Sequence, residues 1–374
     1  MHRRLTGADD ADCTVLMTGA GAPGAAGIVK SLRTTAERTF HIVGVDMNDD
    51  AYGFALVDEH ATVPAGKADE YVPRMADIAA RVDADVILPL TTAEIEPLSA
   101  ARETFEGTVM VSQQESLAVA NDKGQLYEFL DQEGFDVAPA YHRVDTEAEF
   151  LAAVDALGYP ERPVCFKPPV ASGMRGFRVL RADADRLDRF LRSKPESPVA
   201  TLEAVRPILS SGASFPELIV MEYLPGEEYS VDTLAMGGTV GPVIPRSRRR
   251  TRAGISFAGT VDRREELIEA ATAICNRLGL RYNINLQFKY DAEGQPKVIE
   301  INPRVAGTIV MCAGAGVNLP YLGVKHALGE SIPPVEVQWG TQMARYWQEV
   351  FRTPEGEPYH LESSHDPSLT GDST

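Results

Sequence analysis

The chain has 374 residues, 44% of them hydrophobic, with a formal net charge of −18 and a pI near 4.9. This length is enough for two or three domains with buried cores, and the hydrophobic fraction excludes a disordered chain. The acidity excludes a duplex-binding surface, because phosphate neutralisation needs a basic face, and we expect no nucleic-acid partner.

Only eight of the 36 basic residues are Lys. A chain this acidic and this poor in Lys is typical of a protein that stays soluble in high salt, so we expect a halophilic source. The sequence has no apolar run near the about 18 residues of a spanning helix and no signal-peptide pattern at its start, which predicts a cytoplasmic protein without a membrane partner. The four cysteines lack metal-binding spacing and are expected to be reduced, mostly buried thiols: Cys13, Cys165, Cys275 and Cys312.

Residues 13–120 alternate short apolar runs with helical patterns, which predicts a parallel βαβ sheet. The stretch GAGAPG places Gly19, Gly21 and Gly24 at the GxGxxG spacing of a dinucleotide site, and Asp46 lies where an acid would hold a ribose. Taken alone, this part of the chain predicts a dehydrogenase or an epimerase. The expected strands are Thr14–Thr18, His41–Asp46, Asp85–Pro89 and Thr108–Val111.

The regular alternation of apolar runs and helical patterns ends near residue 121. A helix is expected from a cap at Asn121 or Asp122 to a stop at Gly134. The stretch RPVCFKPPVASGMRGFRVL predicts a strand, a Gly-containing loop and a strand, and ELIVMEYLPGEEYSVDTLAM predicts two strands around a tight turn. The remaining expected elements are a helix over 182–194, a third strand over 238–252, a helix from Arg263 to Leu278, and a hairpin that turns at Glu293-Gly294.

The hairpin carries oxygen ligands at strand spacing. If its two strands pair across Gly294, Gln287 lies close to Glu300, and Asn302 shares a face with Glu300. One carboxylate and two amide oxygens would then point at one spot, and such hard ligands suit Mg²⁺, which takes its other ligands from phosphate and water. Arg304 follows closely enough to meet the same phosphates. The alternative is an ordinary solvated hairpin face.

Two lysines lie in positions that suit anion binding. Lys123 begins the helix after residue 121, and Lys167 ends an apolar strand just before the loop that holds Gly173, Arg175 and Gly176. A buried ammonium needs an anion nearby, and glycines beside a cation let the backbone fold over phosphates. For Lys167, the alternative is a structural salt bridge.

These stretches, in the order NDK, FKPPVASGMRG, MEYLPGEEYSVD, NLQFKY and VIEINPR, resemble the ATP-grasp superfamily over roughly residues 13 to 330. They are most similar to the carbamoyl-phosphate-synthase large-subunit branch and its short, stand-alone relatives. The resemblance implies a mixed α/β and α+β fold, a Rossmann-like pre-ATP-grasp domain followed by a two-lobed ATP-grasp domain. The implied parts are the first domain (13–120), a small lobe with a phosphate lid (121–212), a large lobe with the metal site (213–350) and a polar tail (351–374).

The resemblance also implies a role for each matching residue. It implies that the first domain does not hold NAD and that its glycine turn shapes the floor of the acceptor site. Many ATP-grasp ligases carry an acid where this chain has Gln287, while the synthase branch has Gln. The resemblance therefore leaves open whether a second metal ion binds. The implied roles are α- and β-phosphate binding by Lys123 and Lys167, a lid containing Gly173, Arg175 and Gly176, adenine binding by backbone groups of Glu222, Tyr223 and Leu224, ribose binding by Glu228, Mg²⁺ (or Mn²⁺) binding by Gln287, Glu300 and Asn302, and γ-phosphate binding by Arg304.

Arginine is dense over residues 246–252, where the stretch RSRRRTR lies in an otherwise acidic chain. On a strand, Arg248, Arg250 and Arg252 would share one face. Arg binds carboxylates and acyl-phosphates bidentately, so we expect Arg248 and Arg250 to contact the acceptor. The alternative is a solvated strand or an intersubunit ion-pair surface.

A further motif, YLGVK, matches the YxxxK of short-chain dehydrogenases but lies too far along the chain, and we expect Tyr321 and Lys325 to form a half-exposed helix face.

We therefore expect an ATP-dependent carbon–nitrogen ligase that activates a carboxylate as an acyl-phosphate for attack by an amine and releases ADP and phosphate. The expected partners are small-molecule carboxylate and amine substrates. The sequence leaves open whether the chain forms a homodimer. The chain has room for one grasp module, which argues against carbamoyl-phosphate synthesis. The alternatives are a bicarbonate-using carboxylase or carbamate-forming enzyme, a non-catalytic ATP-binding regulator, and, on the glycine signature alone, an NAD-dependent oxidoreductase.

Overall fold

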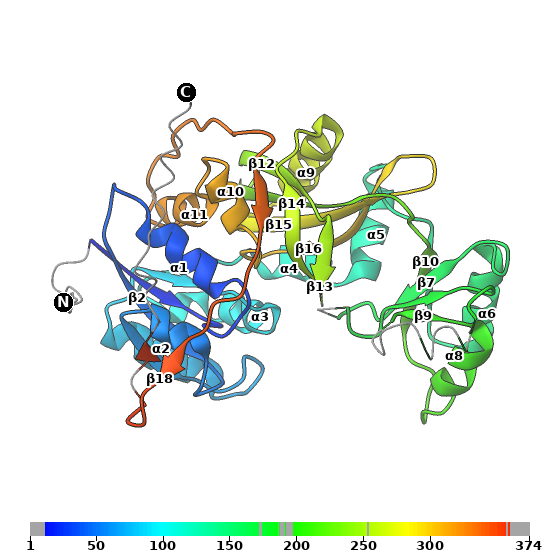
Figure 1. Ribbon diagram of the computed structural model, residues 1–374, viewed down its shortest axis with the longest axis horizontal. Coiled ribbons are helices and arrows are strands. Elements are labelled where there is room, and N and C mark those ends of the chain that lie inside the picture. Colours follow the sequence, from blue (N-terminus) through cyan, green and yellow to red (C-terminus); the bar gives the residue numbers. More distant parts are fainter. Residues whose placement is uncertain are drawn as a thin grey trace.

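The computed structural model describes residues 12–171, 174–185, 187, 191, 197–252, 254–356 and 358–359. Three regions follow one another along its long axis: the N-terminal sheet at one end, a four-stranded sheet in the middle, and a five-stranded sheet at the other end (Figure 1). Within these described residues, the helices are all too short or too polar to cross a lipid bilayer.

The N-terminal sheet is parallel, with strand order β3-β2-β1-β4-β5, as the alternation of strands and helices predicted. Parallel strands need a crossover between them, and the amphipathic helices supply it. The sequence did not reveal β3, a short edge strand whose polar residues stay partly exposed. The elements are β1 (Cys13–Met17), α1 (Ala25–Arg33), β2 (Phe40–Asp46), η2 (Tyr52–Leu56), β3 (Glu59–Thr62), α2 (Tyr71–Arg81), β4 (Val86–Leu88), α3 (Thr92–Ala100), η3 (Arg102–Thr104), β5 (Thr108–Val109) and α4 (Gln114–Asn121).

The five-stranded sheet of the small lobe has the order β6-β10-β7-β8-β9. The strand β10 comes after residue 212, where we expected the small lobe to end, yet it pairs with both β6 and β7. The helix expected over 182–194 lies largely outside the described residues. The elements are α5 (Lys123–Gln132), β6 (Tyr141–Val144), α6 (Glu147–Ala156), β7 (Val164–Lys167), β8 (Arg178–Leu180), β9 (Val199–Ala200), α8 (Leu202–Leu209) and β10 (Leu218–Glu222).

The central sheet is antiparallel, with the order β12-β11-β15-β16. The strands β15 and β16 form the predicted hairpin, and Gln287 lies opposite Glu300 in its register. The elements of the large lobe are β11 (Glu228–Met236), β12 (Val240–Ser247), β13 (Arg250–Arg252), β14 (Ile255–Thr260), α9 (Glu265–Arg277), β15 (Arg281–Tyr290), β16 (Pro296–Asn302), α10 (Val310–Gly314) and α11 (Leu319–Ala327).

The prediction of a single strand over 238–252 was wrong. The chain leaves the central sheet after Ser247 and starts a new strand at Arg250, which pairs with β14. The break coincides with a close crossing of two backbones, because a Cβ atom on Gly259 would lie 2.1 Å from the Ser247 carbonyl oxygen. The arginines of this stretch therefore do not share one continuous strand face.

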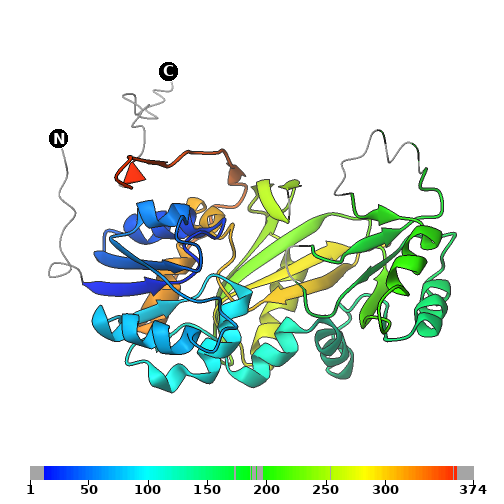
Figure 2. The same ribbon diagram turned by 90° about the horizontal axis from the view of Figure 1, so that it is seen from below.

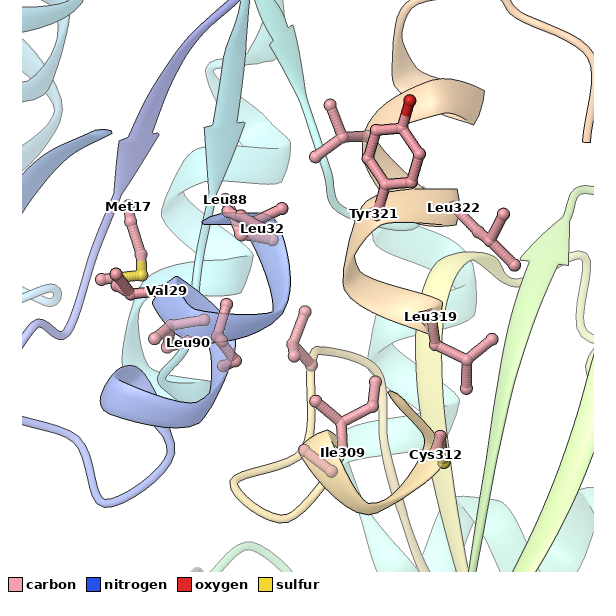
Figure 3. Packing of buried hydrophobic residues seen from close by; sticks show 14 of the residues in the cluster. Met17, Val29, Leu32, Leu88, Leu90, Ile309, Cys312, Leu319, Tyr321 and Leu322 are labelled. Carbon is pink, nitrogen blue, oxygen red and sulfur yellow. The ribbon is translucent and has the colours of Figure 1, made fainter. Parts of the chain in front are cut away.

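The helices α10 and α11 pack against α1 and the N-terminal sheet, so one hydrophobic core joins the two ends of the chain (Figure 3). The expectation of a half-exposed face on α11 was wrong, because Tyr321 and Lys325 are 6% and 7% exposed. They are buried because α11 packs between α1 and β15. The Lys325 ammonium is compensated by Glu37 at 2.5 Å and Glu330 at 3.2 Å. Tyr321 and Lys325 therefore stabilise the junction of the first domain with the large lobe.

Residues 340–356, here called the C-terminal strap, return from the large lobe to the first domain. Their strand β17 (Gln342–Ala344) adds to β14 in a three-stranded sheet with β13. Further along, β18 (Phe351–Arg352) pairs with β19 (Pro358–Tyr359) beside the N-terminal sheet (Figures 1 and 2). The strap thus links the three-stranded sheet to the first domain, over the loop that follows β16.

Candidate active site

The two predicted phosphate lysines lie beside the predicted metal carboxylate. Asp122 caps α5 by accepting a hydrogen bond from the Gln125 amide, which fixes Lys123 as the first residue of the helix. The Nζ atom of Lys123 is 3.5 Å from Oε2 of Glu300 and donates to the Ala171 carbonyl at 3.1 Å. The structure therefore joins residues that are far apart in sequence.

Lys167 is buried at the end of β7, and its ammonium donates to the Tyr127 hydroxyl at 3.1 Å and to a carbonyl of a β-bulge. In the β15–β16 pairing, Gln287 faces Glu300 and Phe288 faces Val298, which leaves Ile299 as the extra residue. The Ile299 carbonyl accepts from Lys167 Nζ at 3.1 Å and from the Tyr127 hydroxyl at 2.8 Å. Burial is the main cause that lowers the pKa of Lys167 to about 7, and the positive charge of Lys123 is the second. This ammonium lacks a close anion of its own among the described residues.

The predicted metal ligands converge as the hairpin register implied. The Asn302 amide donates to Glu300 Oε1 at 3.1 Å, and Gln287 lies opposite Glu300 on β15. Burial alone would raise the pKa of Glu300, but the nearby charges of Lys123 and Lys167 outweigh it and hold the pKa below its usual value. Glu300 is therefore an anion at neutral pH. The described residues contain no group of three or more His, Cys, Asp or Glu that could hold a metal, so this set depends on amides and on one carboxylate.

Arg304 extends the same site beyond β16. Its guanidinium donates to Asn302 Oδ1 at 3.1 Å and to the Val305 carbonyl at 3.0 Å, and its buried Nε has no hydrogen-bond partner in the described structure. Desolvation lowers the pKa of Arg304, although the charges of Glu300 and Asp232 oppose this. An Arg with an unused buried donor beside the ligand set is suited to an anion such as phosphate.

The residues expected to hold the nucleoside lie where the two lobes join. The Glu222 carboxylate accepts from the Ala140 amide at 2.8 Å, so its side chain is engaged in the structure. Tyr223 and Leu224 follow β10, and their backbone groups make no backbone hydrogen bond with any described residue. Their backbone donors and acceptors are therefore not used by the described backbone. Glu228 forms an ion pair with Arg248, with 2.7 Å between Oε1 and Nε.

The arginine-rich stretch separates into buried and exposed residues. Arg248 is mostly buried, and it also donates to Ser230 at 3.3 Å and to the Gly254 carbonyl at 2.7 Å. Arg250 is exposed on β13. In the lid loop, Arg175 and Gly176 are exposed, while Gly173 lies outside the described residues. The structure therefore places Arg248 beside Glu228 and does not bring Arg250 to the same point.

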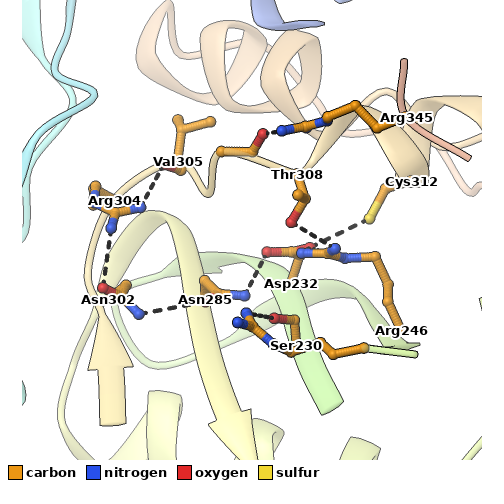
Figure 4. A network of polar contacts seen from close by, with 12 residues as sticks. Ser230, Asp232, Arg246, Asn285, Asn302, Arg304, Val305, Thr308, Cys312 and Arg345 are labelled. Carbon is orange, nitrogen blue, oxygen red and sulfur yellow. Dashed lines mark hydrogen bonds and ion pairs between the residues drawn. The ribbon is translucent and has the colours of Figure 1, made fainter. Parts of the chain in front are cut away.

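Sequence analysis missed the role of Arg246, which is 1% exposed. Its guanidinium donates to Asp232 at 2.5 Å and to Thr308 at 2.8 Å, and the same Asp232 accepts from Asn285 at 2.8 Å (Figure 4). Every second residue of a half-buried strand faces the core, and an Arg at such a position needs a buried acid. Asp232 on the neighbouring β11 could have been found only through the register that pairs it with Ile244.

The glycine turn of the first domain is folded onto this network. Gly19 has a φ of +60°, and a Cβ atom on Gly24 would lie 2.4 Å from the Cα atom of Gly307 in the loop after β16. The Asp46 carboxylate accepts from the Gly21 amide at 2.8 Å and from Asn48 at 2.9 Å. Of the acid that would bind a ribose in a dehydrogenase, one oxygen thus accepts from the glycine turn and the other from Asn48 just after β2.

The comparisons with known proteins agree with this geometry. Residues 214–349 match the family described as ATP-grasp in the biosynthetic pathway with Ter operon, and residues 15–111 match the family described as PylC-like, N-terminal domain. An N5-carboxyaminoimidazole ribonucleotide synthetase, solved as its ADP complex, has the same fold, with a TM-score of 0.66 at 16% identity over 88% of this chain and 80% of that one. Residues 214–349 thus carry an ATP-grasp domain, and the chain as a whole shares the fold of that synthetase.

Two curated relatives of this chain are much longer. Carnosine synthase 1 from Gallus gallus is 33% identical over 130 residues, which cover 32% of this chain and 14% of that protein. Pyruvate carboxylase from Bacillus subtilis (strain 168) is 25% identical over 296 residues, which cover 74% of this chain and 24% of that protein. The chain thus spans less than a quarter of the length of either relative, and their activities come to it only as proposals.

Proposed function

We propose that this ATP-grasp chain is an ATP-dependent carbon–nitrogen ligase that phosphorylates a carboxylate and passes the acyl group to an amine. The observation that supports it is the meeting of Lys123, Lys167, Glu300, Asn302 and Arg304 at the end of one hairpin. These are the positions at which the order of sequence motifs implied phosphate and metal binding. If these residues had only a structural role, there would be no need to gather three cations around one carboxylate at this point.

In the proposed reaction, the side chains position the reactants and neutralise charge. Lys123 and Lys167 would hold the α- and β-phosphates beneath the lid, and Arg304 would stabilise the γ-phosphoryl group as it moves to the substrate carboxylate. The backbone groups after β10 and the Glu228 carboxylate would hold adenine and ribose. A protein nucleophile is not required, and burial raises the pKa of the Cys165 and Cys275 thiols to about 12, which suits structural roles.

The ligand chemistry fits Mg²⁺, with Mn²⁺ as a replacement. Glu300 supplies one carboxylate that is ionised at neutral pH, and Asn302 and Gln287 supply amide oxygens next to it. Such a cation would neutralise the β- and γ-phosphates and orient them. One protein carboxylate leaves most of the coordination to phosphate and water, as is usual for Mg²⁺.

A second candidate is a carboxylase that uses bicarbonate or forms a carbamate. The observation in its favour is the pyruvate carboxylase similarity, which extends over 74% of this chain. Both candidates begin with attack of an oxyanion on the γ-phosphate, so the nucleotide site alone does not separate them. They differ in whether turnover requires bicarbonate.

The test is an ADP-release assay with ATP and Mg²⁺, pools of amino acids and other carboxylates, and parallel reactions with and without added bicarbonate. ADP release that requires a carboxylate and an amine supports the ligase. Release that requires bicarbonate supports the carboxylase. ATP binding without release under any of these conditions would favour a non-catalytic regulator. The assay is run at low and at high salt, because the acidic, Lys-poor chain is expected to come from a halophilic source.

Other expectations from the sequence also stay proposals. We propose a cytoplasmic enzyme with small-molecule partners, of the carbamoyl-phosphate-synthase-like branch, that acts as a homodimer. Buried, unpaired thiols are in accord with a reducing compartment, since all four cysteines are free. Sedimentation analysis of the purified chain would determine the oligomeric state.

A further inference from the structure

Arg345 of the C-terminal strap is a partly buried cation without an acidic partner. Its Nη2 donates to the Gly307 carbonyl at 2.8 Å, and its own amide donates to the Phe257 carbonyl at 2.8 Å. Among the described residues, no carboxylate lies within ion-pair distance of its guanidinium. A charge removed from water is costly unless an opposite charge meets it, so this partly buried guanidinium favours an anion that the described residues do not provide.

The place where Arg345 lies is defined by four segments of the chain. The strap carries Arg345, and the loop after β16 carries Gly307 (Figure 4). The glycine turn of the first domain touches that loop through Gly24, and Tyr52 of η2 donates its hydroxyl to the Ala22 carbonyl at 2.6 Å. Tyr52 is near enough that its phenol interacts electrostatically with Arg345. Arg345 therefore lies at the seam between the first domain and the large lobe.

Arg345 differs from the two other arginines of this region. Arg246 is neutralised by Asp232, and Arg304, which donates to Asn302 and to the carbonyl that follows it, lies among the proposed phosphate and metal ligands. Burial lowers the pKa of Arg345, whereas Tyr52 opposes the shift and the charge of Arg246 adds to it. A guanidinium remains charged in a protein despite such shifts. Arg345 thus carries its charge away from the proposed phosphate ligands, and its planar donor set suits a carboxylate.

We propose that Arg345 binds the free carboxylate of the amine substrate, so that this substrate is an amino acid or a peptide with a free carboxyl group. The inference rests on the proposed ligase function. The carboxylate that becomes phosphorylated must lie next to the γ-phosphate, where Arg304 and the ligands on β16 are located. Arg345 contacts none of those groups and faces the loop of Gly307 instead, so the anion that it binds is a different one.

The first experiment compares an acceptor found by the ADP-release assay with the carboxamide of the same acceptor. Arg345→Gln should raise the KM for the acceptor roughly 10- to 100-fold, the range expected for loss of a charge-assisted hydrogen bond, and leave the KM for ATP unchanged. The carboxamide should be a poor substrate for the wild type and for the variant alike. Arg345→Lys, which keeps the charge and loses the planar fork, should recover part of the loss.

Arg352→Gln is the matched control, because Arg352 lies on the same strap, is exposed, and its side chain makes a single long hydrogen bond within the described residues, to Gly356 at 3.5 Å. It should behave as the wild type. Equal effects of Arg345→Gln on the carboxylate and on its carboxamide would overturn the proposal, as would an effect confined to the KM for bicarbonate. Thermal melting of each variant shows whether the backbone bond to Phe257 keeps the strap in place.

A second measurement separates this inference from the ligase proposal. Ligand-observed NMR with a pool of the twenty amino acids, in the presence of ADP, detects binding without turnover. Binding by the wild type that is lost in Arg345→Gln supports the carboxylate site even if ADP release fails in every assay. Absence of binding by the wild type overturns the site, whether or not ADP is released with other substrates.

Discussion

The Nζ atom of Lys123 and Oε2 of Glu300 are 3.5 Å apart, so a residue proposed to bind phosphate is paired with the carboxylate proposed to bind a cation. Each charge compensates the other while both are largely removed from water. A triphosphate with its cation offers each of them a stronger partner of the correct sign. We therefore expect Lys123 and Glu300 to exchange each other for the phosphates and the cation when the nucleotide binds.

Glu300→Gln should abolish turnover while the fold persists. Gln keeps the volume but removes the only carboxylate of the proposed metal set, and loss of one such contact commonly lowers kcat by a factor of about 10² or more. ADP release at saturating Mg²⁺, measured with thermal melting, checks this. Glu293→Gln is the control, since Glu293 is exposed at the turn of the same hairpin. Near-normal turnover of Glu300→Gln would remove the metal assignment.

The lowered pKa of Lys167 gives ATP binding a pH signature. Its pKa falls from 10.5 to about 7 in the folded protein, so between these pH values the unfolded chain holds the proton and the folded chain does not. Stability from this group therefore rises as the pH increases through that window, and below about pH 7 the buried charge lowers stability. Phosphate beside Lys167 should restore the proton.

Calorimetric titration of ATP within that window, in two buffers with different ionisation enthalpies, should show uptake of up to about one proton for each ATP. Lys167→Met should remove this uptake and weaken ATP binding. Buffer-independent heats with the wild-type protein would mean that Lys167 does not meet the phosphates.

The ion pair between Arg248 and Glu228 predicts which substrate each mutation affects. From sequence we expected Arg248 to contact the acceptor, but the structure pairs it with the residue proposed to hold the ribose. Arg248→Gln should raise the KM for ATP by about tenfold, since a hydrogen bond to a charged group contributes roughly 1.5–3 kcal/mol, and should change the acceptor KM less. Arg249→Gln, an exposed neighbour, should change neither. A larger effect of Arg248→Gln on the acceptor KM would restore the original expectation.

Patterns of short range predicted much of the fold and of the candidate site. The two-residue period of β15 and β16, with a glycine turn between them, was enough to place Gln287 opposite Glu300. The bulge at Ile299 was not predictable, because a single extra residue leaves no mark in the hydrophobic pattern. That bulge supplies the carbonyl to which Lys167 donates.

Contacts between distant segments accounted for the remaining errors. Arg248, Arg250 and Arg252 were expected to share one strand face toward the acceptor, but the strand breaks after Ser247. Arg246 is buried because Asp232 lies on the neighbouring strand. Tyr321 and Lys325 read as half exposed, but α1 covers them. Arg345 carried no signal at all in the sequence, since its meaning depends on the fold of the strap over the loop of Gly307.

The buried pair of Arg246 and Asp232 should be strongly coupled in stability. Asp232→Ala leaves the guanidinium buried without its acid, which typically costs about 3–5 kcal/mol. Arg246→Met with Asp232→Leu should recover much of the loss, because neither charge then remains. Chemical denaturation of the two single variants and the double variant measures the coupling. Additive losses would show that the two charges do not depend on each other.

The contact between Gly24 and Gly307 predicts how the glycine turn contributes to activity. A Cβ atom on Gly24 would lie 2.4 Å from the Gly307 Cα atom, and because both partners are backbone, no rotamer change relieves the clash. The φ of Gly24, −97°, is one that Ala adopts without strain, so Gly24→Ala tests the close approach alone.

The substitution should push the turn away from the loop that carries Gly307 and thereby displace the carbonyl that positions Arg345. We expect a raised acceptor KM with a smaller change in the KM for ATP. Gly27→Ala is the matched control, since the three atoms nearest to its added methyl belong to the side chain of Val310, at 3.0 to 3.5 Å, and Ala favours the helix there by about 1 kcal/mol. Equal acceptor KM values for the two variants would mean that the glycine turn packs the first domain without shaping the acceptor site.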